Sequence, residues 1–484
     1  MSPLLLFSFV IVYFLILLGV AWVTGRNSTN ESFFIGNKSS NWMLVAFGMV
    51  GTSLSGVTFV SVPGNVAKEG FAYFQVTIGY ILGYIIIAYV LLPLYYRLNL
   101  TSIYNYLMNR LGFKSYKTGA SFFILSRILG ATARLYLVVN ILQDAILNSF
   151  GVPFWATTLI ILSMILLYTF EGGVKTIVWT DTLQTSCMLI GLVICVVYIL
   201  NNLHIGFAGS IEAMSAKGYS NIFFFDPNSK LYFIKQILAG AFIAITMTGM
   251  DQEMMQKNIS VKTLKDSQKN VISMTIVLSF SILLFLYLGG LLYLYAGKQG
   301  VTEIGDKLFP AIALKHMPPF VSVIFIIALI SALFPSADGA ITALTSTFCI
   351  DILGIQRNTN HTEQKKKKIR QIVHLSFAAV FLIFVLIFKV VNSASMITVI
   401  LKVASYTYGP ILGLFSFGIL LKRQVNDKLV PFVCIGAPMI CFVIDNFQQQ
   451  IFGNFKLGLE LLIINGLITF LGLFLISSPK SVAE

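Results

Sequence analysis

The stretch AFGMVGTSLSGVTFVSVP, residues 46–63, is an apolar run long enough to cross a bilayer, but its middle is unusual. Between Gly51 and Gly56 it contains only glycine, serine, threonine and one leucine, which weakens a helix halfway across the membrane. A discontinuous helix exposes backbone carbonyls and a half-helix N-terminus at mid-depth, a geometry that suits ion and solute binding. Close helix packing through small residues is the alternative, and this stretch alone does not distinguish the two.

Apolar runs of this length recur along all 484 residues of the chain. Hydrophobic residues make up 57% of the sequence and charged residues 11%, with a mean hydropathy of +0.85. A soluble domain carries about 25% charged residues, and only helices satisfy the lipid-facing backbone of such runs. We therefore predict an all-α integral membrane protein with a single transporter domain over residues 1–484. About 13 transmembrane helices are expected, at residues 3–24, 42–63, 72–95, 118–148, 154–170, 177–200, 232–250, 271–296, 319–348, 372–390, 395–421, 429–446 and 457–477.

Lysine and arginine are distributed unevenly over the loops between these spans. The net charge is +14, and 21 of the 33 basic residues lie in one alternate set of loops, against seven in the other. Cytoplasmic loops are enriched in basic residues, so this bias predicts a multi-pass protein of the cell (inner) membrane. Its N-terminus would lie outside and its C-terminus in the cytoplasm. Because topology explains the positive charge, we expect the lipid bilayer, and no nucleic acid, as a partner.

Motifs for other chemistry are absent from the sequence. Neither a G-x-x-x-x-G-K-[ST] loop nor a G-x-G-x-x-G turn after a strand occurs, so an ion gradient rather than ATP is the expected energy source. The five cysteines form no C-x-x-C pair, and the four histidines are scattered over loops and helix ends. We therefore expect no disulfide framework, no histidine or cysteine metal site, and no enzymatic activity of an integral-membrane transferase.

Charged side chains inside spans are costly, which makes Asp181, Asp338 and Arg134 candidates for function. Asp338 lies in SALFPSADGAITALTS, residues 331–346, whose carboxylate, hydroxyls and carbonyls suit a hard cation such as sodium. The alternative for Asp338 is pairing with a neighbouring helix. Arg134 lies about 24 Å into the fourth span, too deep to reach the interface easily. It binds an anionic group of the substrate or pairs with a carboxylate of the protein.

A charged segment, DQEMMQK at residues 251–257, follows the seventh span on the expected cytoplasmic side. Its acidic, amide and basic side chains interrupt the apolar pattern. We interpret this segment as a capped, solvated loop.

Three stretches together resemble the sodium:solute symporter family, which includes sodium-coupled sugar, proline and sialic-acid carriers. They are GG…WTD…Q at residues 172–184, the hydroxyl-rich segment at residues 331–346, and YGPILGLF at residues 408–415. The first is the most specific of the three, and the likeness covers nearly the whole chain.

The resemblance implies an inverted-repeat (5+5) symporter fold with broken helices at mid-membrane, which works by alternating access and functions as a monomer. Its first repeat would cover approximately residues 42–200 and its second approximately residues 232–421. The flanking helices would be residues 3–24, 429–446 and 457–477.

The resemblance also implies sodium ions as the cofactor and places their ligands. The usual site would use carbonyls of Gly51 and Leu54 together with Ala332 and Ser336, although Pro335 replaces one expected serine. A second site, present in some members, would use Asp181 and a ninth-span hydroxyl position. That position holds Asp338 in this chain, and two carboxylates near one cation bind it more strongly. We therefore expect the principal cation site to be shifted toward Asp181 and Asp338.

Solute contacts carried over from the sialic-acid members fall on residues of the second and third spans, and we add Arg134 of the fourth span as a further candidate. These positions are Ser53, Ser55, Thr58, Tyr73, Thr77 and Arg134. The carboxylate-binding arginine of those carriers aligns with Gly130, and Arg134 lies one helical turn further on the same face. The substrate is thus a small polar solute: a sugar, a sugar acid or a carboxylate.

The sequence as a whole predicts secondary active transport, with sodium-coupled symport of this solute into the cell. Two alternatives remain open at this point. Asp181 and Asp338 titrate instead of coordinating sodium in a proton-coupled symporter. A transporter-like nutrient sensor would act through a separate partner chain.

Overall fold

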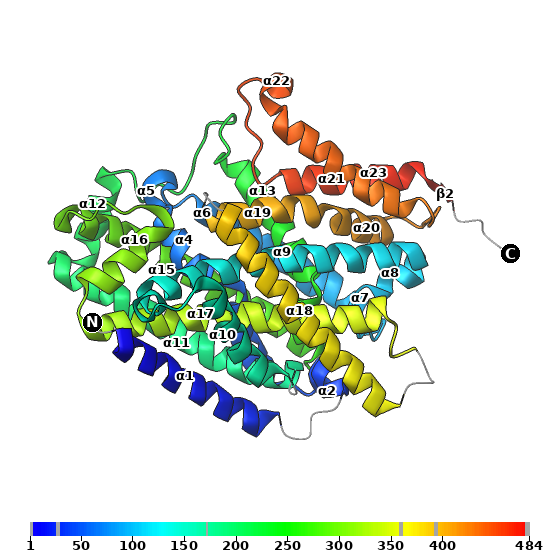
Figure 1. The fold of residues 1–484 in the computed structure, drawn as a ribbon. Coiled ribbons are helices and arrows are strands. Elements are labelled where there is room, and N and C mark those ends of the chain that lie inside the picture. Colours follow the sequence, from blue (N-terminus) through cyan, green and yellow to red (C-terminus); the bar gives the residue numbers. More distant parts are fainter. Residues whose placement is uncertain (1–2, 26–29, 171–172, 358–361, 392–394, 480–484) are drawn as a thin grey trace.

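The computed structural model describes residues 3–25, 30–170, 173–357, 362–391 and 395–479, and its architecture is almost entirely helical (Figure 1). The helices of the membrane bundle are α1 (Pro3–Thr24), α3 (Trp42–Ser53), α4 (Gly56–Gly64), α6 (Tyr73–Ile86), α7 (Leu92–Arg97), α9 (Phe113–Ala145), α10 (Phe154–Thr169), α11 (Gly173–Leu203), α13 (Phe233–Ala244), α14 (Gln252–Ile259), α15 (Leu264–Gln299), α17 (Pro319–Thr347), α18 (Glu363–Val391), α19 (Met396–Thr407), α20 (Gly409–Leu420), α21 (Val430–Asn446) and α23 (Leu461–Leu475).

Short elements connect these helices. They are α2 (Asn30–Ile35), α5 (Val66–Glu69), α8 (Asn105–Arg110), α12 (Phe207–Ala216), α16 (Leu308–Ala311) and α22 (Gln448–Phe452), with one antiparallel pair of strands, β1 (Arg423–Val425) and β2 (Ser477–Pro479). Among the described residues, seven helices are long and apolar enough to cross a membrane, and up to ten if each bent pair counts as one span. Three shorter apolar helices, α10, α21 and α23, occupy the remaining expected ranges.

Three of the spans are bent pairs of helices. The pair α3–α4 bends by 52°, at the glycine- and serine-rich stretch where a break is expected. The other two bends lie just after the expected seventh span, 232–250, and within the expected eleventh span, 395–421. The segment Phe233–Gly249 meets α14 at 64°, and α19 meets α20 at 45°.

Each break has a local cause. The carbonyl of Val50 still accepts from Leu54 N, but the chain then leaves the helix and restarts at Gly56. Asp251 caps α14, because its side chain accepts from Glu253 N and Met254 N. At the third break, Pro410 follows Gly409 in the first turn of α20, where a proline fits but cannot continue α19.

Glycines let the helices next to these breaks approach closely. A Cβ at Gly79 of α6 would lie 2.1 Å from the carbonyl oxygen of Ile237, and one at Gly240 of α13 would lie 2.2 Å from that of Val76. Gly83 packs similarly on Ala241, one turn along. This small-residue packing joins α6 and α13 as a unit.

The bundle is centred on α17. Its apolar window is 83% buried, whereas that of α1 is 33% buried. α1 packs on α10 and α11, and α23 packs on α20 and α21, so these flanking helices lie on opposite sides of the bundle (Figure 1). Bent pairs open both expected repeats, at α3–α4 and at α13–α14. The repeat boundaries at residues 42–200 and 232–421 remain a prediction.

Candidate ion and solute site

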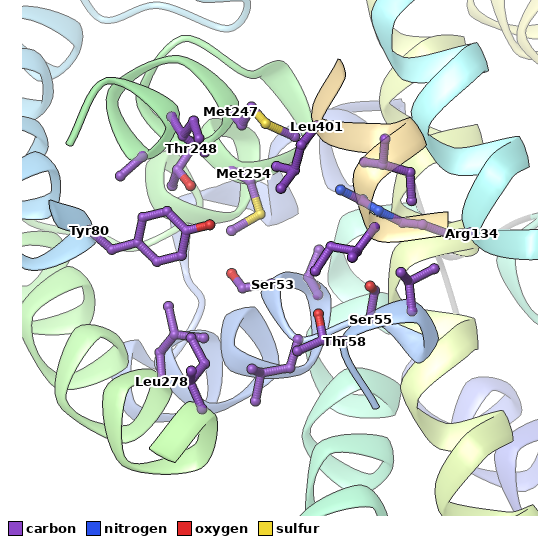
Figure 2. Close-up of a pocket in the computed structure, with 18 of the residues that line it drawn as sticks. Ser53, Ser55, Thr58, Tyr80, Arg134, Met247, Thr248, Met254, Leu278 and Leu401 are labelled. Atoms are coloured by element: carbon purple, nitrogen blue, oxygen red, sulfur yellow. The ribbon is translucent and has the colours of Figure 1, made fainter. Parts of the chain in front are cut away.

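The break between α3 and α4 borders a central cavity of about 100 Å³ (Figure 2). Five predicted solute residues line it: Ser53, Ser55, Thr58, Tyr73 and Arg134. Thr77 does not line it; this residue is fully buried, and its hydroxyl donates to the carbonyl of Tyr73 one turn earlier in α6. Figure 2 shows Tyr80 and Arg134 reaching into the cavity from opposite sides.

Sequence reasoning missed much of the opposite wall. Tyr80 and Tyr84 follow Tyr73 at intervals of seven and four residues, which places all three on one face of α6. The hydroxyl oxygens of Tyr73 and Tyr80 lie 3.1 Å apart, and those of Tyr84 and Thr248 lie 3.4 Å apart. That tyrosine spacing was visible in the sequence. The contribution of Thr248 was not, because it depends on how α13 packs against α6.

The rest of the wall is apolar. It consists of Ile243, Met247, Met254, Leu278, Ile282, Ile397, Ile400 and Leu401, with Leu54, Val57 and Ala244. No aspartate or glutamate is among the described residues that line the cavity. Its polar groups are therefore hydroxyls and arginine.

Two arginines of α9 face this region, and the structure gives them different roles. Arg127 Nη2 lies 3.1 Å from Asp251 Oδ1 and 2.5 Å from Glu253 Oε2. No acidic partner or hydrogen-bond acceptor is found for Arg134 within the described parts of the chain. Of the two roles considered for a deep arginine, structural pairing thus belongs to Arg127. Arg134 keeps its donors directed into the cavity.

The segment at residues 251–257 is not a solvated loop. It forms the cap and most of α14, and every residue of Gln252–Ile259 is buried. Hydropathy is a local sum, so it assigns such charges to solvent and cannot show that they meet partners from distant helices. Asp251 is also bonded by the hydroxyl of Tyr408 at 2.7 Å, which ties α14 to the α19–α20 break.

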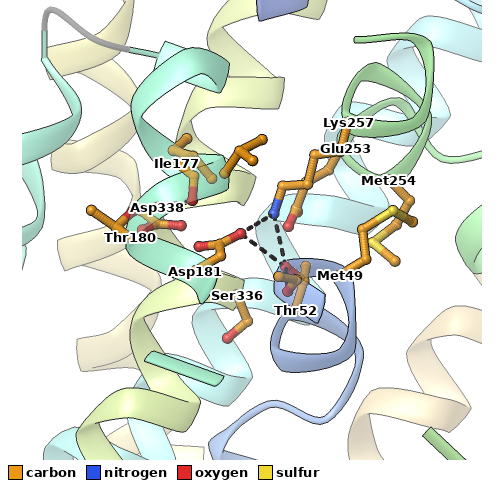
Figure 3. A network of polar contacts seen from close by, with 12 residues as sticks. Met49, Thr52, Ile177, Thr180, Asp181, Glu253, Met254, Lys257, Ser336 and Asp338 are labelled. Carbon is orange, nitrogen blue, oxygen red and sulfur yellow. Dashed lines mark hydrogen bonds and ion pairs between the residues drawn. The ribbon is translucent and has the colours of Figure 1, made fainter. Parts of the chain in front are cut away.

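Lys257 of α14 makes the central contact of a second cluster (Figure 3). Its Nζ lies 2.7 Å from Asp181 Oδ2 and 2.8 Å from Thr52 Oγ1. Figure 3 shows Asp338 beside Asp181. The hydroxyl of Tyr168 donates to Asp338 Oδ2 at 2.7 Å. The structure thus brings Asp181 and Asp338 together, as expected, and adds a lysine that was not expected there.

Several buried polar atoms near this cluster have no hydrogen-bond partner among the described residues. They are Asp181 Oδ1, Asp338 Oδ1, both amide atoms of Gln184, and the hydroxyls of Thr185 and Thr342. Unpartnered buried oxygens are costly, and ligand ions or water are the usual explanation. This oxygen-rich set fits a hard cation.

The usual sodium position also has suitable oxygens. Carbonyls after Val50 lack helical partners because α3 ends at Ser53. The start of α4 lies against α17, since a Cβ at Gly56 would be 3.7 Å from Leu333 N. Ser336 donates to the carbonyl of Leu333 at 2.8 Å, which leaves its own lone pairs available. The α3–α4 break and Ser336 thus bring suitable oxygens to the expected position, and the ligand set of Gly51, Leu54, Ala332 and Ser336 remains a prediction.

A bundle of apolar helices, with broken spans around a central cavity and buried oxygens without partners, is the architecture of a secondary transporter. The profile of the sodium:solute symporter family matches residues 33–428, and the chain belongs to this family. Membership of this family supports the expectation of a sodium-coupled transporter over that of a membrane enzyme.

Relatives of the chain agree with this assignment. The chain is 26% identical over 416 residues to the sodium-coupled monocarboxylate transporter 1 of Mus musculus, with 83% of this chain and 66% of the mouse protein covered. It is 21% identical to the sodium/sialic acid symporter NanT of Aliivibrio fischeri, with 93% and 89% covered. The chain thus spans just under two thirds of the mouse relative's length.

Solved structures confirm the fold. A substrate-bound, outward-open sodium-coupled sialic acid symporter matches with a TM-score of 0.83 at 18% identity, over 97% of both chains. A nucleobase-cation-symport-1 family transporter matches with a TM-score of 0.57 at 12% identity, over 92% of this chain and 93% of that one. The symporter fold expected from the sequence is therefore present.

Proposed function

We propose that this protein carries a small organic carboxylate into the cell together with sodium. The observation that supports this most directly is Arg134, an arginine in the central cavity with no acidic partner among the described residues. A guanidinium left without an anion in such a place is costly, and a substrate carboxylate would supply two oxygens in a matching fork geometry.

The remainder of the cavity supports a solute with a polar end and an apolar body. Ser53, Ser55 and Thr58 offer hydroxyls near the helix break, and methionine, leucine and isoleucine side chains cover the other side. A neutral hexose would leave Arg134 unpaired, so a site of this kind should discriminate strongly against it. Two of the relatives are named for monocarboxylates and for sialic acid, both of which are acids.

Sodium would bind between the α3–α4 break and α17, on the oxygens of Gly51, Leu54, Ala332 and Ser336. Asp338, whose Oδ1 has no partner in the described chain, would add negative charge to this region. The ion would neutralise the carbonyl dipoles of the break and hold α4 against α17. Solute and sodium binding would be coupled because both use the residues of one broken helix.

The protein would lie in the cell membrane with its N-terminus outside and its C-terminus in the cytoplasm. The basic loops support this orientation. A single chain contains the cavity and all proposed sodium ligands, so we propose that it functions as a monomer.

Uptake by proteoliposomes tests the function. The purified protein is given short monocarboxylates, sialic acid, neutral hexoses and proline, with inward gradients of sodium or of potassium. We expect uptake of a carboxylate only with sodium. Uptake of a neutral sugar alone, or uptake driven by acid pH without sodium, would contradict the proposal.

Arg134 variants test the recognition step. Arg134→Ala should raise KM for the carboxylate by about 100-fold, since removing one partner of a buried charged pair costs about 2–5 kcal/mol. Arg134→Lys retains the charge and should lose less. Met247→Leu, which changes the same wall without changing charge, is the matched control. Equal losses in the Arg134→Ala and Met247→Leu proteins would contradict a role for the guanidinium.

A further inference from the structure

The ammonium of Lys257 occupies a position where a second sodium ion would have to bind. Lys257 Nζ is 2.7 Å from Asp181 Oδ2, and the two side chains are 2% and 1% exposed. Thr52 Oγ1 completes the contact from α3 at 2.8 Å. Three elements that are far apart in sequence, α3, α11 and α14, therefore meet around one positive charge (Figure 3).

Sodium and an ammonium compete for the same carboxylate. A sodium ion liganded by Asp181 would need these carboxylate oxygens at short range, and Lys257 already uses Oδ2 at ion-pair distance. Two cations on one buried carboxylate repel each other strongly, because little water is available to screen them. Lys257 thus already balances the negative charge of Asp181, although Asp181 Oδ1 has no hydrogen-bond partner among the described residues.

Ion pairs and hydrogen bonds also hold α14, the helix that carries Lys257, in place. It lies one helical turn after Glu253, and Glu253 is paired with Arg127 of α9. The cap residue Asp251 is bonded by both Arg127 and Tyr408. These contacts fix α14, the helix that carries Lys257, next to Asp181.

We propose that Lys257 is a tethered cation that replaces the second sodium ion at Asp181, so that this transporter binds one sodium ion per chain. A sodium ion is released to the cytoplasm in each cycle, whereas Lys257 stays attached to α14. The coupling ratio is therefore one sodium per solute. This inference rests on the proposed function for its coupling ratio, but the number of bound ions is measurable without any solute.

Binding of radioactive sodium to the purified full-length protein tests the proposal. Wild type should bind about one ion per chain, with a Hill coefficient of about 1, because a single site saturates hyperbolically. Lys257→Gln exposes the Asp181 carboxylate and should bind about two ions, with a Hill coefficient above 1, since an added charged ligand strengthens cation binding. Lys257→Arg keeps the charge and should still bind one.

Asp181→Asn gives a second, independent measurement if Lys257→Gln does not fold. Because no sodium uses Asp181 in the wild type, this variant should still bind one ion. The double variant Lys257→Gln/Asp181→Asn should also return to one ion. Two ions bound by wild type, no gain in Lys257→Gln, or loss of an ion in Asp181→Asn would each overturn the inference. Absence of any sodium binding by wild type would overturn sodium coupling itself, which separates failure of the proposed function from failure of this inference.

Discussion

At the scale of single residues, some charged side chains buried in this bundle form ion pairs, and others do not. Arg127 and Lys257 have acidic partners at 2.5–3.1 Å, and their side chains are nearly inaccessible. Arg134 has no acidic partner in the described chain, and one carboxylate oxygen each of Asp181 and Asp338 has no hydrogen-bond partner there. Paired charges hold helices together, and the unpaired ones are where external ligands would bind.

Arg127→Ala should destabilise the protein by about 3–5 kcal/mol, because it leaves Asp251 and Glu253 buried without their cation. The matched control is Lys269→Ala, which removes a half-exposed partner of Asp266 and should cost about 0–1 kcal/mol. Thermal unfolding in detergent, followed by intrinsic fluorescence, compares the two. Similar midpoints for both variants would show that the buried ion pair contributes little.

Asp338→Asn should raise the sodium concentration for half-maximal uptake by about tenfold, the equivalent of about 1.4 kcal/mol. The substitution retains the size of the side chain and removes its negative charge. Asp351→Asn is the control, because Asp351 is a buried carboxylate at the end of the same long helix and is bonded by Ser102 and Tyr116. A sodium dependence in Asp338→Asn equal to that of wild type would disprove a role for Asp338 in cation binding.

At the scale of elements, the structure depends on where helices break and how closely they then pack. The break in the second span was predictable, because Gly51 and Gly56 weaken the helix locally. The Gly409–Pro410 pair is a local sequence signal for the break in the eleventh span. Asp251 is a local N-cap signal for the start of α14, but its burial depends on Arg127, which comes from α9.

Gly51→Ala should destabilise the protein by about 1–3 kcal/mol, because overpacking a tight interface strains it. The new Cβ would lie 2.2 Å from Thr185 Oγ1 and would push α3 away from α11. Gly130→Ala is the control, since nothing lies within 4 Å of a Cβ at that position. It should be neutral, or stabilising by up to about 1 kcal/mol. Unfolding midpoints that fall equally in both variants would contradict the packing explanation.

At the scale of the whole molecule, the central cavity and a second cavity next to it indicate from which side the solute enters. The second cavity, of about 200 Å³, shares Tyr73, Ile397 and Leu401 with the central cavity. These three side chains therefore separate the cavity from the side of the protein that carries Lys230. That side is the expected exterior, so we expect solute to enter past them.

Cysteine labelling in intact cells tests this orientation. Lys230→Cys, at the second cavity, should react with a membrane-impermeant maleimide added outside. Lys365→Cys, in the lysine-rich first turn of α18 on the expected cytoplasmic side, should react only after the cells are permeabilised. Both side chains are exposed, and the wild-type protein measures the background from its five cysteines. The opposite pattern would reverse the orientation proposed from the basic loops.

The sequence by itself determined the membrane class, the positions of the spans, the break in the second span and the family. These follow from local sums of hydropathy and from short motifs. Only the tertiary structure decided that Arg127 is paired while Arg134 is not, and that Lys257 meets Asp181. The partners are 124 and 76 residues apart, and the hydropathy of a segment contains no information about which distant helix will face it.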